Sequence, residues 1–242
     1  MSDIILHHYP QSPVSEKVWA GLGIKNATWR SVEIPCQPPK PSLMPLTGVY
    51  QHALDANLHR HVLRQRMIMR ILDQRILEPA FYSDTSTVWN AGGMFILIFR
   101  LALVFTRDPV PPGFVEDRGQ FYLGRDWDMV AISGQIPDVI TGIEERFKAL
   151  DLALSGDPLF LEGSTPNVEG ANAYHLVWFL RCRWADGATL LSKLPNLLAR
   201  EQRMAHIGHG TWSHMTSSES LELAKNSKPA TPARICKNDR SD

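Results

Sequence analysis

At the start of the chain a short apolar run is followed by apolar residues at helical spacing, and this pattern predicts a strand, a turn and a helix. Residues 4–6 form a continuous apolar run, and residues 9–11 then contain the proline of a turn. Ser12 and Pro13 follow, and valine or leucine recurs at four-residue spacing from Val14 to Leu22. Serine is a favoured N-cap, and proline suits the first helical position. We therefore predict a helix that begins at Pro13.

The next segments extend this start into an α/β unit. Residues 27–34 alternate and are rich in β-branched and aromatic side chains, which predicts a second strand parallel to the first. Residues 35–45 contain five prolines and predict an extended loop. Residues 51–66 have few β-formers and no proline, so their local preference is a basic, poorly amphipathic helix. This preference conflicts with the strands that such a unit needs there, which predicts poor order.

Beyond residue 67 the apolar positions recur at helical spacing. Residues 67–76 predict one more helix, and the polar stretch 79–87 predicts a domain boundary. The predicted helical segments after it cover residues 88–105, 114–154 with interruptions, 166–184, 187–206 and 217–225. The most apolar of them, 166–184, is expected in the core. We therefore predict a small α/β domain (1–83), an all-α domain (84–225) and a disordered tail (226–242).

Composition excludes several classes of function. The 242 residues are 44% hydrophobic and 21% charged with a formal net charge of +0, so no net field attracts nucleic acid or an anionic membrane. The longest apolar run, residues 94–105, is shorter than the roughly 20 residues that span a bilayer. Neither the three cysteines nor the three histidines of 51–66 have metal-ligand spacing. Without a signal-like start, this predicts a cytoplasmic protein with no metal, membrane or nucleic-acid partner.

The candidate chemistry lies where the first strand passes into the first helix. Unpaired N–H groups and the positive end of the helix dipole converge on Ser12, so a thiolate or carboxylate is favoured beside its hydroxyl. The alternative is that Ser12 only caps the helix, as serine before a helix commonly does.

Several segments together resemble the glutathione S-transferase family. The segment HHYPQSPVSEKV is similar to the first strand, turn and helix of its serine-type members, in which SPxS stands where glutaredoxins have CPxC. RSVEIP, KPSLMPLTG, RILDQR, VWNAGG, GFVEDRG, EERFKALD and AYHLVWFLR resemble later segments of a bacterial-type subgroup. The resemblance implies a thioredoxin-like N-terminal domain, an all-helical C-terminal domain and a homodimer. It also implies a transferase that conjugates glutathione, as co-substrate, to a small hydrophobic electrophile in detoxification.

The same resemblance assigns roles to individual residues. Ser12 would donate a hydrogen bond to the glutathione sulfur, with Ser15 or Tyr9 as alternative sources of the hydroxyl. Gln11 and Lys40, together with Ser12 and Ser15, would contact the tripeptide. The pocket of the second substrate would be lined by Tyr9, Trp89 and Met94, although Trp and Met on a helix are more commonly core residues.

One part of the family pattern is absent. Its members have a proline before the third strand and an Asp/Glu-Ser pair that opens the third helix, and residues 51–66 contain neither. Plausible codons for residues 53–67, read one nucleotide later, encode both features, so a compensated frame slip is one hypothesis. Asn167 and Gly170 also replace a usual Ser/Thr-x-x-Asp cap, which predicts a helix start weaker by about 1 kcal/mol.

These departures leave a second class of function open. The chain could be a catalytically impaired binding or scaffold protein with this fold, or a damaged gene product without a complete glutathione site. A thiol-disulfide oxidoreductase is a third interpretation. It requires a cysteine at the helix mouth, where this chain has Ser12.

Overall fold

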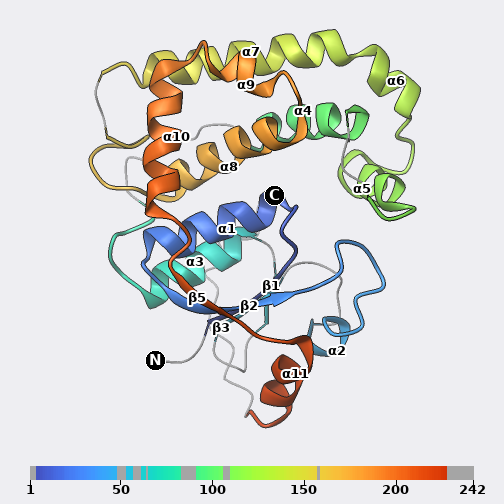
Figure 1. Ribbon diagram of the computed structural model, residues 1–242, viewed down its shortest axis with the longest axis vertical. Helices are drawn as coiled ribbons and strands as arrows, with labels where there is room; N and C mark the ends of the chain where they lie inside the picture. Colours follow the sequence, from blue (N-terminus) through green and yellow to red (C-terminus); the bar gives the residue numbers. More distant parts are fainter. Residues whose placement is uncertain are drawn as a thin grey trace, which may run out of the picture.

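A computed structural model describes residues 4–47, 53–56, 61–63, 65–82, 91–105, 110–156 and 159–227. A mixed sheet and its helices form the lower part of the molecule, and a layer of helices lies above them (Figure 1). The elements are β1 (Ile4–His8), α1 (Pro13–Ile24), β2 (Thr28–Glu33), α2 (Met44–Thr47), β3 (Ala53–Ala56), β4 (His61–Leu63), α3 (Gln65–Arg75), α4 (Ala91–Val104), α5 (Phe114–Leu123), α6 (Met129–Gly134), α7 (Ile136–Ala153), α8 (Val168–Arg183), α9 (Gly187–Leu191), α10 (Pro195–Ile207), β5 (Thr211–His214) and α11 (Ser217–Lys225).

The first βαβ unit forms as the hydrophobic pattern predicts. β1 pairs in parallel with β2, with Ile4 opposite Trp29 and His8 opposite Glu33. α1 begins at Pro13, with Ser12 as its N-cap. Its apolar side chains pack with those of α3 below α8, which places the helix between the sheet and the upper layer (Figure 1).

Residues 53–56 and 61–63 form strands, so the local preference for a helix is wrong there. β3 runs antiparallel to β1, and β4 runs antiparallel to β3, with Ala53 opposite Leu63. If these residues were helical, the backbone N–H and C=O groups on this edge of β1 would have no partners. Pairing with β1 satisfies them, and this tertiary interaction outweighs a weak local preference. The sheet therefore contains the hairpin that the fold class requires.

The last two elements return to the sheet instead of ending the helical layer. β5 pairs in parallel with the outer side of β2, and the strand order is β4-β3-β1-β2-β5. α11 lies on the side of the sheet opposite α1 and α3 (Figure 1), where Met215 and Leu223 pack on Ile5 and Val32. The sequence prediction places residues 211–225 in an all-helical domain, and their strand and their packing correct that part of the assignment. Residues 83–90, with the predicted boundary, lie outside the described residues, as does the predicted tail from 228 on.

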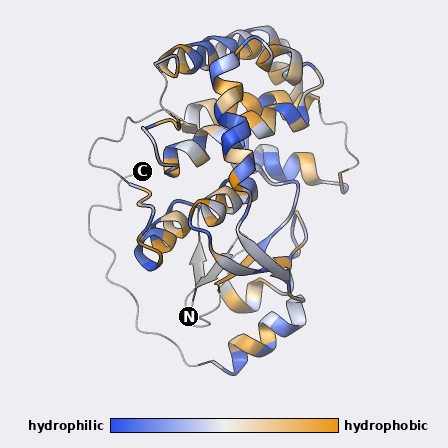
Figure 2. Ribbon diagram, turned by 60° about the vertical axis from the view of Figure 1, so that its left-hand side comes forward, coloured by the Kyte–Doolittle hydropathy of each residue, from blue (hydrophilic) through white to orange (hydrophobic). Residues whose placement is uncertain are grey.

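The helical layer is built around α4, α7 and α8. Their buried side chains form one large apolar cluster to which α9 and α10 also contribute. Figure 2 shows that the helices of the upper layer carry both hydrophobic and hydrophilic residues. The interrupted helix over 114–154 is confirmed as α5, α6 and α7, and the apolar 166–184 segment as the core helix α8. None of the described helices is long and apolar enough to cross a membrane.

The start of α8 is capped. Asn167 Oδ1 accepts a hydrogen bond from the backbone N–H of Gly170 at 3.0 Å, and its Nδ2 donates to Glu162 Oε2 at 2.6 Å. The sequence predicted a weaker start for this helix. Only one part of the cap is missing: Gly170 has no side chain to accept a hydrogen bond from the backbone N–H of Asn167.

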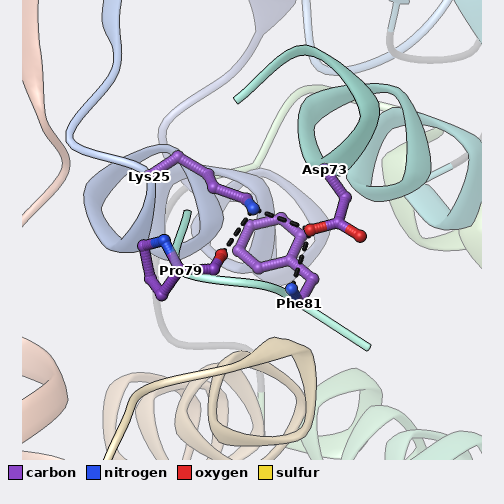
Figure 3. A network of polar contacts seen from close by, with 4 residues as sticks. All are labelled: Lys25, Asp73, Pro79 and Phe81. Atoms are coloured by element: carbon purple, nitrogen blue, oxygen red, sulfur yellow. Dashed lines mark hydrogen bonds and ion pairs between the residues drawn. The ribbon is translucent and has the colours of Figure 1, made fainter. Parts of the chain in front are cut away.

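A buried ion pair fixes the segment that follows α3 (Figure 3). Lys25 Nζ donates to Asp73 Oδ1 at 2.7 Å and to the Pro79 carbonyl at 2.5 Å. The backbone N–H of Phe81 donates to the same Asp73 oxygen at 2.7 Å, and Lys25 Nζ lies 4.2 Å from the centroid of the Phe81 ring. The Phe81 carbonyl then accepts from the backbone N–H of Val168 at 3.3 Å. This network, the Lys25 brace, connects α1, α3 and α8.

Candidate functional site

Ser12 stands at the positive end of α1. Its backbone is extended (φ −83°, ψ 121°), and its Oγ accepts a hydrogen bond from the backbone N–H of Ser15 at 3.2 Å. The Ser12 N–H donates in turn to the Tyr9 carbonyl at 3.2 Å, which closes the turn between β1 and α1. The hydroxyl thus lies where the helix dipole favours negative charge, because the first N–H groups of a helix have no partner within it.

Tyr9 brings a second hydroxyl to this turn. Its side chain is buried and hydrogen-bonds with that of Ser12. Burial raises the pKa of the Tyr9 phenol, while the Arg118 charge and the Ser12 hydrogen bond act in the opposite direction. The net direction is upward, so Tyr9 is a neutral phenol at physiological pH, able to donate or accept a hydrogen bond.

Two cations flank the Tyr9 ring. Lys40 Nζ lies 5.4 Å and Arg118 Cζ 5.7 Å from its centroid, within the range of cation–π attraction. Lys40 is only 2% exposed, and within the described part of the chain its ammonium has neither a hydrogen bond nor an ion pair. Burial, with a smaller contribution from Arg118, lowers the pKa of Lys40 to about 8. The ammonium is therefore still mostly charged at neutral pH and lacks a partner anion among the described residues.

α5 joins this cluster from the helical layer. Arg118 Nη2 donates to the Cys36 carbonyl, and its Nη1 lies 3.0 Å from Asp117 Oδ2. Gln37 Nε2 donates to the Pro112 carbonyl at 2.9 Å, just before α5. The proline-rich loop before α2 is therefore held against α5, and the cluster lies between the sheet and the helical layer.

The remaining predicted residues differ in their placement. Gln11 is exposed, and its carbonyl accepts from Arg183 Nη2 of α8 at 3.0 Å. Ser15 is buried, and its Oγ has no hydrogen-bond partner in the described structure. Met94 is fully buried in the large helical cluster, where its surroundings are those of a core residue. Trp89 lies outside the described residues.

The two serine hydroxyls are covered in this structure. Ser12 and Ser15 are each 1% exposed, so a ligand reaches them only if neighbouring side chains move. His8, at the end of β1, lies in the same region: its Nε2 is 2.7 Å from Ser31 Oγ and its ring is edge-on to Trp19. Burial lowers the pKa of His8 to about 4, so its ring is neutral and carries no charge that competes with a bound anion.

Sequence reasoning missed Arg118 and Tyr122. Both belong to α5, and they lie far along the chain from the residues that they approach. Burial chiefly raises the pKa of Tyr122 to about 12, with Tyr9, Arg118 and Asp117 as the charged or titratable neighbours. Their four-residue spacing, which places them on one helix face, was the available signal.

Comparison with known proteins decides the fold family. No family model and no curated protein sequence matches this chain. Among solved structures, a GST-like protein from Pseudomonas syringae is 28% identical with a TM-score of 0.67, and the match covers 99% of this chain and 79% of that one. The chain has the glutathione S-transferase fold. The resemblance predicted from its sequence, and the predicted thioredoxin-like and helical parts, are thereby confirmed.

Two further glutathione S-transferases share this fold at lower identity. The transferase GSTFuA3 from Phanerochaete chrysosporium is 17% identical with a TM-score of 0.65, and the match covers 86% of this chain and 98% of that one. An enzyme from Methylobacillus flagellatus, solved with glutathione bound, is 14% identical with a TM-score of 0.57, with 85% and 99% covered. The serine-type assignment and the frame slip stay predictions.

Proposed function

We propose that this chain binds glutathione as a co-substrate and conjugates its thiolate to small electrophiles. The observation that carries the proposal is Ser12, the N-cap of α1, whose oxygen already accepts from the Ser15 N–H. Solved relatives bound to glutathione and to glutathione sulfonate support the choice of ligand. The predicted homodimer, cytoplasmic location and role in detoxification belong to the same proposal.

The chemistry needs a thiolate, because the neutral thiol is a poor nucleophile. A free thiol has a pKa of about 8.5, so only about 3% is ionised at pH 7. A hydrogen bond to a charged group contributes roughly 1.5–3 kcal/mol, which lowers the thiol pKa by about one to two units. Ser12 donates this hydrogen bond, and the dipole of α1 adds to its effect.

The transfer itself requires no further group on the protein. The thiol proton passes to solvent, and the sulfur lone pair forms a bond to the electrophilic carbon. With an aryl chloride as substrate, the carbon–chlorine bond breaks and chloride leaves with the bonding pair. Lys40 offers its ammonium to a carboxylate of the tripeptide, and Gln11 contacts the peptide from the turn.

The proposal is tested by Ser12→Ala, with Ser12→Thr and Ser15→Ala as matched variants. We expect Ser12→Ala to raise the pKa of bound glutathione by one to two units, measured by thiolate absorbance, and to lower kcat/KM for chlorodinitrobenzene by about 10- to 100-fold. Ser12→Thr keeps a hydroxyl and should retain most of the activity. The proposal fails if Ser12→Ala matches the parent protein, and loss of activity in Ser15→Ala alone would transfer the role to Ser15.

A second candidate function is a catalytically silent binding or scaffold protein. Two observations favour it: the burial of both serine hydroxyls, and the absence of proline and of an Asp-Ser pair in residues 51–66. The two functions differ in what glutathione does. If millimolar glutathione neither raises the melting temperature nor supports turnover, the silent protein is the better description.

A further inference from the structure

The face of α5 that reaches the site carries hydrogen-bond donors without partners. Arg118 uses Nη2 for the Cys36 carbonyl and Nη1 for Asp117, but its buried Nε has no acceptor in the described structure. One turn further, the Tyr122 hydroxyl makes no hydrogen bond to any described residue. Buried polar groups are nearly always hydrogen-bonded, so the buried and unpartnered Arg118 Nε at a candidate site indicates a ligand acceptor.

The charge around these donors is positive. Arg118 and Lys40 both lie over the Tyr9 ring, and among the described residues only Arg118 is paired with a carboxylate, that of the partly exposed Asp117. Tyr122 contributes no negative charge, because burial keeps the pKa of its phenol at about 12. A buried cation without a full partner is costly, so an anionic group is favoured here.

The same face also offers an apolar wall. The Tyr122 ring lies 5.1 Å from that of Phe95 and 4.7 Å from that of Phe99, both of α4. Aromatic rings favour offset or edge-to-face neighbours, so an aromatic or unsaturated ligand is favoured beside these rings. An apolar wall with adjacent cationic donors suits a molecule that has an apolar body and one acidic end.

We propose that Arg118 and Tyr122 bind the carboxylate of the second substrate, so that the preferred electrophiles are aromatic or unsaturated acids. This inference rests on the proposed function for its reaction and names the class of substrate for that site. Arg118 forms charge-assisted hydrogen bonds to the carboxylate, and Tyr122 donates a third. Lys40 then binds a carboxylate of glutathione, so the carboxylates of glutathione and of the second substrate bind to different cations.

The test compares an acid with its neutral ester. Conjugation is measured with para-chloro-meta-nitrobenzoate and with the methyl ester of the same compound. We expect the parent protein to prefer the acid, and Arg118→Met to lower the acid-over-ester ratio of kcat/KM by about 10- to 100-fold. Tyr122→Phe keeps the ring and should lower the ratio by about 3- to 10-fold. Arg125→Met, an exposed arginine just beyond α5, is the matched control and should leave the ratio unchanged.

The glutathione carboxylates are the competing source of an anion at Arg118. Glutathione and its ethyl ester are therefore compared in the same variants. If Arg118→Met changes the preference for glutathione over its ester, and not the preference for the acidic electrophile, the proposal is overturned. Equal kcat/KM of the parent protein for acid and methyl ester overturns it as well.

A binding measurement separates this inference from the proposed function. Calorimetry with the unreactive meta-nitrobenzoate and its methyl ester needs no turnover and no thiolate. Acid binding that Arg118→Met weakens supports the inference even if Ser12→Ala shows that the proposed reaction is wrong. Equal binding of acid and ester, or equal binding by the Arg118→Met variant, refutes the inference alone. Retained secondary structure and melting temperature in Tyr122→Phe guard against a folding defect.

Discussion

The Lys25 brace offers a sharp test of how the two layers are joined. The side chain of Lys25 is 0% exposed and that of Asp73 is 24% exposed, so the ion pair is mostly screened from water. Asp73→Asn keeps an oxygen for the Phe81 N–H but removes the charge that balances Lys25. Breaking a buried pair in this way costs about 3–5 kcal/mol, and the partial exposure of Asp73 places the expected loss near about 3 kcal/mol.

The reverse change and the double variant give the coupling energy. Lys25→Met removes the buried cation and leaves an aspartate that can still reach water, so we expect a smaller loss of about 1–2 kcal/mol. When Lys25→Met is already present, Asp73→Asn should cost less than about 1 kcal/mol, because no unpaired cation remains. The coupling energy between the two sites is then about 2 kcal/mol.

Urea unfolding followed by tryptophan fluorescence and circular dichroism measures the four free energies. The control is the exposed pair of Lys148 and Glu144, 3.4 Å apart on α7, for which coupling should stay below about 0.5 kcal/mol. If the Lys25–Asp73 coupling is no larger than that of the control, the ion pair is not a brace and the reasoning is refuted.

Three further predictions concern stability. Burial lowers the pKa of His8 to about 4 and that of His175 to about 3, below the ordinary 6.5, so the unfolded chain binds more protons from pH 6.5 downward. The free energy of unfolding therefore falls as pH falls, by about 4 kcal/mol for the two histidines together between pH 7 and pH 5. In urea unfolding at these two pH values, His8→Asn should show a smaller loss than the parent protein. An equal loss in both proteins would contradict the prediction. Gly23→Ala places a Cβ 1.9 Å from the Gly208 carbonyl oxygen and should cost at least about 2 kcal/mol in urea unfolding, whereas a neutral effect would show that the two backbones separate easily. Asn167→Ala removes the α8 cap and should lower the free energy of unfolding by about 1 kcal/mol, and an unchanged value would mean that water replaces it.

Sequence reasoning succeeded where the signal was local. Ser12 before Pro13, with an apolar repeat after it, contains within one turn everything that positions the start of α1. The helices of the upper layer could also be predicted, because a long helix repeats its pattern of apolar positions over several turns. These segments give the fold class and the predicted residues Tyr9, Ser12 and Ser15 of the candidate site.

The rest depends on contacts between distant parts of the chain. Residues 53–56 become a strand because β1 lies beside them, and nothing in their composition signals that neighbour. β5 is four residues long with no buried residue, so it is too short for an alternating pattern to appear. Arg118 meets the carbonyl of Cys36 82 positions away, so its role in the site emerges only in three dimensions.

The return of β5 and α11 to the sheet has a consequence for synthesis on the ribosome. The first strands are made early, but β2 lacks its outer neighbour until residues 211–214 have left the exit tunnel. During that interval Ile5 and Val32 are not yet packed against Met215 and Leu223. A ribosome stalled before residue 211 should therefore carry a nascent domain in which one face and one edge of the sheet are exposed. Chaperones can bind this surface until β5 and α11 have been synthesised.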